Sequence, residues 1–194
     1  MKNLSYFSKT IYAITPNRPI DEYSLRRVLE NYNISIVQYR RKNCDMVTLL
    51  NEAEQIKQIC KEHKVLFIVN DYIELARLCE SDGIHLGGDD QSIIEARKEL
   101  GKDMIIGKSC YNSIENALIA EKDGANYVAF GAIFPSETKS NAPNCSLDII
   151  REASMKVSIP IVGIGGIDFS KFDEVFEAGC DSIAMVNALF QPSN

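Results

Sequence analysis

Short apolar segments alternate with helical patterns along the whole chain. Between the apolar segments, hydrophobic residues recur at helical spacing; after Asp45, for example, Leu49, Ala53, Ile56 and Cys60 fall on one helix face. Eight segments are predicted to be strands, at residues 10–15, 35–40, 66–70, 83–86, 104–108, 127–132, 161–164 and 182–186. Residue types that cap helix N-termini stand at the predicted helix starts: Asp21, Asp45, Ser92, Ser113, Ser146 and Asp168.

Strict strand–helix alternation predicts a parallel sheet, and almost continuously apolar strands predict burial on both faces. Eight units favour a closed (β/α)8 TIM barrel, with an open doubly wound sheet as the alternative. No linker or change of composition interrupts the pattern, so we expect a single (β/α)8 barrel domain over residues 1–194. Few residues follow Val186, which predicts a truncated last helix whose place in the wall is covered by residues 1–9 or by a partner subunit of a homo-oligomer.

Composition narrows the functional classes. The chain of 194 residues is 45% hydrophobic and 25% charged, with a formal net charge of −6. We expect a cytoplasmic protein with no membrane partner, because the apolar runs are short and the start lacks a signal core. Binding to nucleic acid is not expected, since it needs a basic surface. The six cysteines have no metal-binding spacing and are predicted to be buried free thiols.

Functional residues of a barrel collect where its strands end. After the second predicted strand, alternation puts Gln38, Arg40 and Lys42 on one side and Tyr39 and Arg41 on the other. Gln38 and Arg40 then point into the barrel mouth. A guanidinium in the mouth needs a partner, and a phosphate suits Arg40 beside Lys42. A solvated strand end or an internal ion pair is the alternative.

Carboxylates follow the next two strands. Asp71 comes after the third strand and Asp90 after the fourth. Together they could share Mg²⁺, which accepts one or two carboxylates plus substrate phosphates. Alternatively, each aspartate caps the helix that follows it.

Other strand ends are also polar. Ser109 stands near the fifth strand end, and a polar loop from Ser136 to Lys139 follows the sixth, where an ordinary exposed loop is the alternative. Gly165 and Gly166 follow the seventh strand, a recurrent phosphate site of barrels. His85, within the fourth strand, is interpreted as a hydrogen-bonded structural residue.

At these residues the sequence resembles the thiamine-phosphate synthase (thiamine-phosphate pyrophosphorylase) family. The resemblance covers nearly the whole chain, and six motifs occur in the family's order. They are Gln38-Tyr39-Arg40-Arg41-Lys42, Asn70-Asp71, His85-Leu86-Gly87-Gly88-Asp89-Asp90, Gly107-Lys108-Ser109, Phe134-Pro135-Ser136-Glu137-Thr138-Lys139 and Ile164-Gly165-Gly166-Ile167.

The resemblance implies a (β/α)8 fold and a Mg²⁺-dependent transferase. The family joins two small molecules, hydroxymethylpyrimidine pyrophosphate and a thiazole phosphate, and releases pyrophosphate. It implies Arg40, Lys42 and Lys139 as catalytic residues and Asp71 and Asp90 as metal ligands. The implied substrate contacts are Gln38, Tyr39, Arg40, Arg41, Lys42, Asn70, Ser109, Ser136, Glu137, Thr138, Lys139, Gly166, Val186 and Asn187.

The chain departs from the family pattern at several positions. Gly88 replaces a usual Gln, Ser136 a usual Thr, Asn187 a usual Ser and Pro16 a usual Asp, and the loop after Lys139 is short. Two other functions therefore stay open. One is a thiazole tautomerase-like isomerase, although that branch uses a histidine where this chain has Tyr111. The other is a non-catalytic binder of a thiamine precursor.

Overall fold

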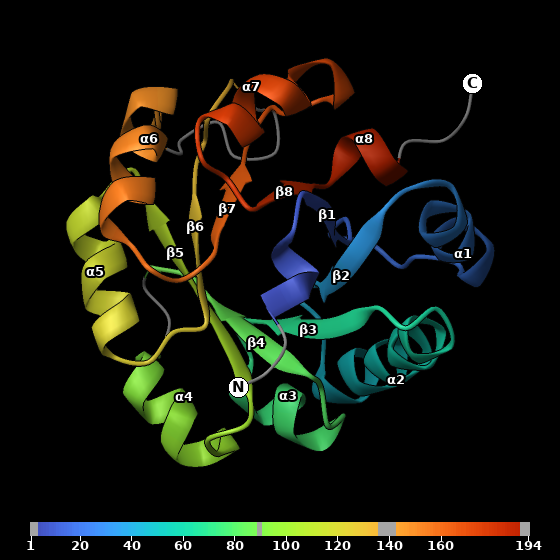
Figure 1. Cartoon of the computed structure of the whole chain (residues 1–194). Helices are drawn as coiled ribbons and strands as arrows, with labels where there is room; N and C mark the ends of the chain where they lie inside the picture. Colours follow the sequence, from blue (N-terminus) through green and yellow to red (C-terminus); the bar gives the residue numbers. More distant parts are fainter. Residues whose placement is uncertain (1–3, 89–90, 136–142, 191–194) are drawn as a thin grey trace.

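Eight parallel strands form a closed barrel in the order β1 to β8 (Figure 1). The structure is a computed structural model that describes residues 4–88, 91–135 and 143–190. β1 pairs in parallel with both β2 and β8, which closes the ring and excludes the open sheet. The strands are β1 (Thr10–Ile14), β2 (Ile34–Tyr39), β3 (Leu66–Asn70), β4 (Gly83–Leu86), β5 (Ile105–Tyr111), β6 (Tyr127–Phe130), β7 (Ile161–Ile164) and β8 (Ser182–Met185).

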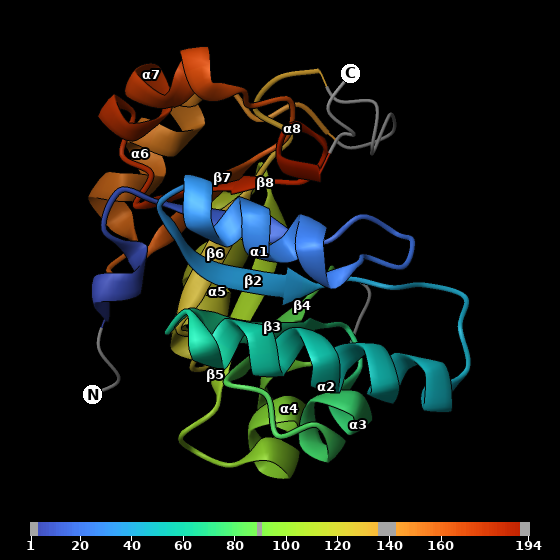
Figure 2. The same ribbon diagram turned by 90° about the vertical axis from the view of Figure 1, so that its right-hand side faces the viewer.

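Helices surround the barrel on its outer side (Figures 1 and 2). They are α1 (Glu22–Asn31), α2 (Met46–Glu62), α3 (Ile73–Leu78), α4 (Ile93–Leu100), α5 (Ile114–Lys122), α6 (Leu147–Lys156), α7 (Phe172–Glu177) and α8 (Asn187–Phe190), with 3-10 turns η1 (Leu4–Phe7) and η3 (Phe169–Lys171). All six predicted caps accept a backbone N–H at the start of a helix or of η3. Each such cap stabilises its helix by about 1 kcal/mol. None of the described helices is both long and apolar enough to span a bilayer.

Two apolar layers hold the barrel together. The outer layer, between strands and helices, contains residues such as Val37 and Val69. The inner layer fills the barrel and contains Tyr12, Ile36 and Tyr127. Strand residues alternate between these layers, so every second side chain of a strand points toward the barrel axis.

The segment η1 lies across the start of the barrel strands. Phe7 is buried, with its ring centroid 5.0 Å from that of Tyr127. The carbonyl of Tyr6 accepts hydrogen bonds from Thr10 Oγ1 (2.7 Å) and Ser35 Oγ (2.6 Å). In Figure 2 this dark blue turn lies at the end of the barrel opposite the arrowhead of β2. These residues therefore close the bottom of the barrel, whereas the short α8 is packed against α1.

Candidate active site

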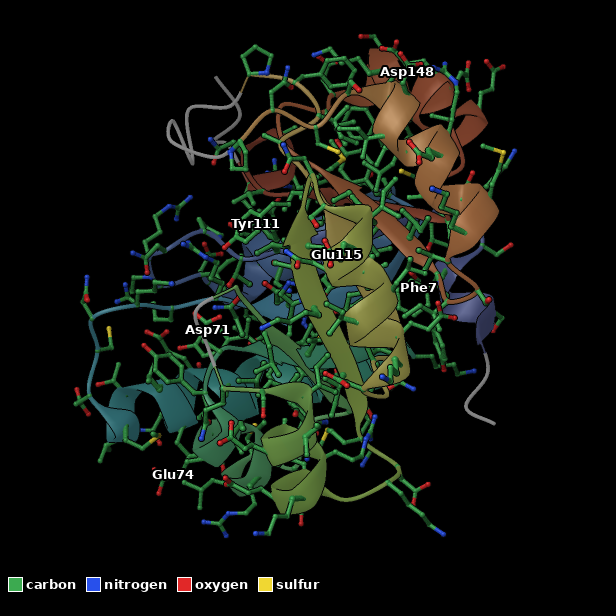
Figure 3. All side chains as sticks on the ribbon, turned by 90° about the vertical axis from the view of Figure 1, so that its left-hand side faces the viewer. Phe7, Asp71, Glu74, Tyr111, Glu115 and Asp148 are labelled. Carbon is green, nitrogen blue, oxygen red and sulfur yellow. The ribbon has the colours of Figure 1, made fainter. Side chains whose placement is uncertain are left out.

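A cavity of about 780 Å³ lies where the strands end. Figure 3 shows Asp71 and Tyr111, two of its lining residues, at the end of the barrel away from Phe7. The cavity brings together nine of the residues that the sequence assigned to the site: Gln38, Arg40, Lys42, Asn70, Asp71, Ser109, Gly166, Val186 and Asn187. Five others, Asp90, Ser136, Glu137, Thr138 and Lys139, lie outside the described residues.

The two cations at the end of β2 differ in their surroundings. Lys42 Nζ lies 3.1 Å from Asp71 Oδ2, so this lysine is already paired. The backbone N–H of Arg40 donates to Thr15 Oγ1 (2.9 Å), which fixes the chain beside β1. The Arg40 guanidinium makes no hydrogen bond or ion pair with any residue that the structure describes. Its charge is therefore available to an anionic ligand in the cavity.

Asp71 has a backbone conformation that few residue types adopt. Its φ of 64° lies in the left-handed region, which aspartate tolerates better than most residues. Its N–H donates to the carbonyl of His85 (2.9 Å). The N-cap of α3 is Tyr72, which makes no side-chain capping bond, so Asp71 does not cap this helix. Its carboxylate lines the cavity instead, where only 15% of the side chain is exposed.

Tyr39 and Arg41 do not line the cavity. Tyr39 donates its hydroxyl to Glu52 Oε2 of α2 (2.6 Å), and Arg41 Nε lies 3.3 Å from the same oxygen. Burial, reinforced by the neighbouring Glu52 carboxylate, raises the pKa of Tyr39. Strand alternation turns these two side chains outward, so their placement gives no support to the substrate contacts implied by the family resemblance.

The loop after β7 requires glycine. Gly165 and Gly166 have φ of 101° and 61°. A Cβ on Gly166 would lie 2.3 Å from the carbonyl oxygen of Pro135. Lys171 Nζ donates to the Gly166 carbonyl (2.9 Å) and to Asp168 Oδ2 (2.8 Å), which ties the loop to η3. This half-buried glycine backbone lines the cavity together with Asn187, and it forms a second place where a phosphate could be held.

A chain of hydrogen bonds crosses the floor of the cavity, and sequence reasoning missed its central members. Gln38 Nε2 donates to Tyr12 Oη (2.8 Å), and Tyr12 Oη lies 2.7 Å from Tyr127 Oη. His85 lies between Tyr127 Oη, 3.0 Å from Nδ1, and Ser109 Oγ, 2.9 Å from Nε2. The structure thus shows His85 hydrogen-bonded, as predicted, and places it in the lining of the cavity. Inward alternation of Tyr12 and Tyr127 along apolar strands was the signal that could have identified them.

Gly88, where the family usually has Gln, lies against the large side chain of Tyr111. A Cβ on Gly88 would lie 2.7 Å from Tyr111 Cε2, and the Gly88 N–H donates to Tyr111 Oη (3.3 Å). The tyrosine ring therefore occupies space into which a longer residue at position 88 would project. Tyr111 also lines the cavity, so this pair reshapes one wall of the site.

Comparisons with known proteins identify the family of the chain. The family model described as "Thiamine monophosphate synthase" matches residues 11–189. A thiamine-phosphate synthase of Methylococcus capsulatus is 43% identical over 196 residues, covering 98% of this chain and 87% of the relative. A second, from Nitrosomonas eutropha, is 39% identical over 186 residues, covering 93% of this chain and 86% of that relative.

A solved structure resembles the fold closely. The thiamine phosphate pyrophosphorylase from Pyrococcus furiosus superposes with a TM-score of 0.87 at 34% sequence identity, covering 96% of this chain and 90% of that one. Sequence and fold therefore agree over nearly the entire length. The chain belongs to the thiamine monophosphate synthase family.

Proposed function

We propose that this protein is a transferase that condenses hydroxymethylpyrimidine pyrophosphate with a thiazole phosphate, giving thiamine phosphate and pyrophosphate. The observation that carries the proposal is the Arg40 guanidinium, which has no partner among the described residues, in the same cavity as the Lys42–Asp71 pair and the Gly165–Gly166 loop. Two anionic substrates need two such places in one cavity.

The reaction can proceed without a protein nucleophile. The C–O bond between the pyrimidine methylene and the pyrophosphate breaks, and its electron pair leaves with the pyrophosphate oxygen. The thiazole nitrogen then donates its lone pair to the methylene carbon and forms the new C–N bond. Arg40 and Lys42 stabilise the negative charge that grows on the departing pyrophosphate. The glycine loop and Asn187 hold the thiazole phosphate, so that its nitrogen faces the carbon.

The residues present fit a magnesium ion. The described part of the chain has no group of three or more His, Cys, Asp or Glu arranged for a metal. Mg²⁺ does not need one, because it is commonly held by one or two carboxylates together with substrate phosphates. Asp71 offers its carboxylate inside the cavity, and Asp90 is the expected second ligand. When bound, Mg²⁺ would neutralise charge on the pyrophosphate.

An assay of the purified chain tests the proposal. With both substrates and Mg²⁺ we expect thiamine phosphate and pyrophosphate in equal amounts, and omission of either substrate or addition of EDTA should abolish both. Conversion of the thiazole phosphate alone, in EDTA, would instead identify an isomerase. Thermal stabilisation by the phosphate ligands with no product under any condition would identify a binder.

Two further expectations belong with this function. We expect the protein to act on small molecules in the cytoplasm. A homo-oligomer stays a prediction, and sedimentation of the purified chain would measure it.

A further inference from the structure

The hydrogen-bonded chain under the cavity has a direction that its own groups determine. Tyr12 and Tyr127 are almost fully buried, at 1% and 0% exposure. Burial raises the pKa of both hydroxyls, so each carries one proton at neutral pH. The direction of each bond can then be assigned by giving every buried proton an acceptor.

The assignment begins at Gln38, whose amide nitrogen can only donate. Tyr12 Oη accepts this bond, and its one remaining partner among the described residues is Tyr127. If Tyr127 donated to Tyr12, the Tyr12 proton would be buried without an acceptor, at a cost of about 1–3 kcal/mol. Tyr12 therefore donates to Tyr127.

The same argument fixes the histidine. Tyr127 accepts from Tyr12, so its own proton goes to His85 Nδ1. If Nδ1 carried a hydrogen, it could not accept the Tyr127 proton, so the hydrogen-bond geometry places the His85 hydrogen on Nε2. Nε2 then donates to Ser109 Oγ. The Ser109 hydroxyl, which lines the cavity, keeps its own proton for a ligand.

We infer that Tyr127 and Tyr12 are positioning residues that set the hydrogen-bonding polarity of the cavity, fixing Gln38 Oε1 as an acceptor and Ser109 Oγ as a donor for the substrate ring. An aminopyrimidine complements this arrangement, since its amino group donates and its ring nitrogens accept. An oxopyrimidine, with a carbonyl oxygen and a ring N–H, reverses the pattern. The choice of ring rests on the proposed function, whereas the direction of the chain does not.

Histidine tautomers measured by 15N NMR test the direction without any substrate. The chain has only two histidines, so His63→Gln assigns both sets of signals. His63 Nδ1 lies 2.9 Å from the Ile59 carbonyl and must donate there, so it serves as an internal reference of opposite type. We expect His85 to carry its proton on Nε2 in the native protein and to populate a second tautomer in Tyr127→Phe. A proton on Nδ1 in the native protein, or no change in the variant, would overturn the inference.

Substrate discrimination tests the consequence for the site. The ratio of kcat/KM for the aminopyrimidine pyrophosphate to that for its oxo analogue should be large in the native enzyme and fall about tenfold or more in Tyr127→Phe and Tyr12→Phe. The KM for thiazole phosphate should not change. Ser182→Ala is the matched control, because it removes a buried hydroxyl, bonded to Thr10 Oγ1 (3.0 Å), away from the cavity.

The outcomes separate the two proposals. Equal losses for both substrates would show a merely structural tyrosine and overturn the inference. If the native protein forms no product from either substrate, the proposed function fails, and the tautomer measurement still decides the direction of the chain. Should one tyrosine variant not fold, the other variant and the native spectrum give the answer.

Discussion

At the scale of single residues, the two cations at the end of β2, Arg40 and Lys42, differ in their surroundings. The Arg40 guanidinium carries a full charge with no partner among the described side chains, whereas Lys42 is held by Asp71. An unpaired cation at the edge of a cavity contributes little to the folded state. Arg40 contributes instead to the binding of an anionic ligand, with which its guanidinium can form charge-assisted hydrogen bonds.

We therefore expect Arg40→Ala to lower kcat/KM by about 10²-fold or more, the scale of losing one electrostatic contact to a growing charge. The thermal midpoint should stay within about 1–2 °C of the native value, because the described part of the chain offers Arg40 no side-chain partner to lose. Arg151→Ala on α6, where the side chain is 53% exposed and paired with Asp148, is the control and should leave turnover unchanged. Full activity of Arg40→Ala would contradict the assignment.

Gly166 allows a test of backbone geometry. Gly166→Ala combines a φ of 61° with a Cβ only 2.3 Å from a backbone oxygen, whereas Gly101→Ala, at φ 84°, meets nothing within 4 Å. Gly166→Ala should lose about 1–3 kcal/mol of unfolding free energy and raise the KM for thiazole phosphate. Gly101→Ala should lose only the smaller free energy that a positive φ costs an alanine. Urea denaturation of both variants measures this difference. Equal losses would show that the contact with Pro135 is not restrictive.

Residue-level prediction succeeded where local rules apply. Strand alternation alone puts Gln38, Arg40 and Lys42 on one side of the chain, and all three line the cavity. The bond between Tyr12 and Tyr127 joins residues 115 positions apart, and no local pattern encodes it. The family resemblance implied Tyr39 as a substrate contact because its motif neighbours are implied. Strand alternation instead turns the Tyr39 side chain outward, and it bonds Glu52 of α2.

At the scale of elements, strand and helix order was predictable, because apolar runs and capping residues are local signals. The end of β5 was not. It continues through polar residues to Tyr111, with an irregular register between Ser109 and Tyr111. Ser109 and Tyr111 are two positions apart and so lie on the same face of the strand, and both line the cavity.

The link between η3 and the glycine loop should depend on pH. Hydrogen bonds from Lys171 and then Ser170 lower the pKa of Asp168 from 3.8 to about 2. A carboxyl with a lowered folded-state pKa stabilises the fold above pH 4, and this contribution disappears as the pH falls toward 2. Asp168→Asn should therefore lose stability less steeply between pH 5 and 2.5, as measured by urea denaturation. Lys171→Met should likewise make the unfolding free energy fall less steeply as the pH decreases. Parallel dependence on pH in the native protein and both variants would contradict the link.

At the scale of the whole molecule, the barrel keeps its thiols inside. All six cysteines are free, as the sequence predicted, and only Cys44 is less than fully buried. Burial raises the pKa of Cys60 and Cys180 to about 12. A buried thiol of high pKa is a poor nucleophile, so these side chains serve packing.

Thiol labelling of the native protein should show this protection. We expect one cysteine, Cys44, to react quickly with a disulfide reagent, and the remaining five to react only at the rate of unfolding. Adding urea should release all five together, because they belong to one cooperative barrel. Cys44→Ser should remove the fast phase, and a second fast thiol in that variant would contradict the packing described.

The turn at the bottom of the barrel constrains the order in which substrates bind and products leave. The Phe7 ring packs against Tyr127 and side chains fill the interior, so the described residues leave no route along the barrel axis. Substrates and products must therefore pass through the same opening of the cavity, at the end of the barrel where the strands end. Whichever substrate occupies the deeper position has to enter first, and it cannot escape past the second, so the fold itself imposes an order of arrival and departure.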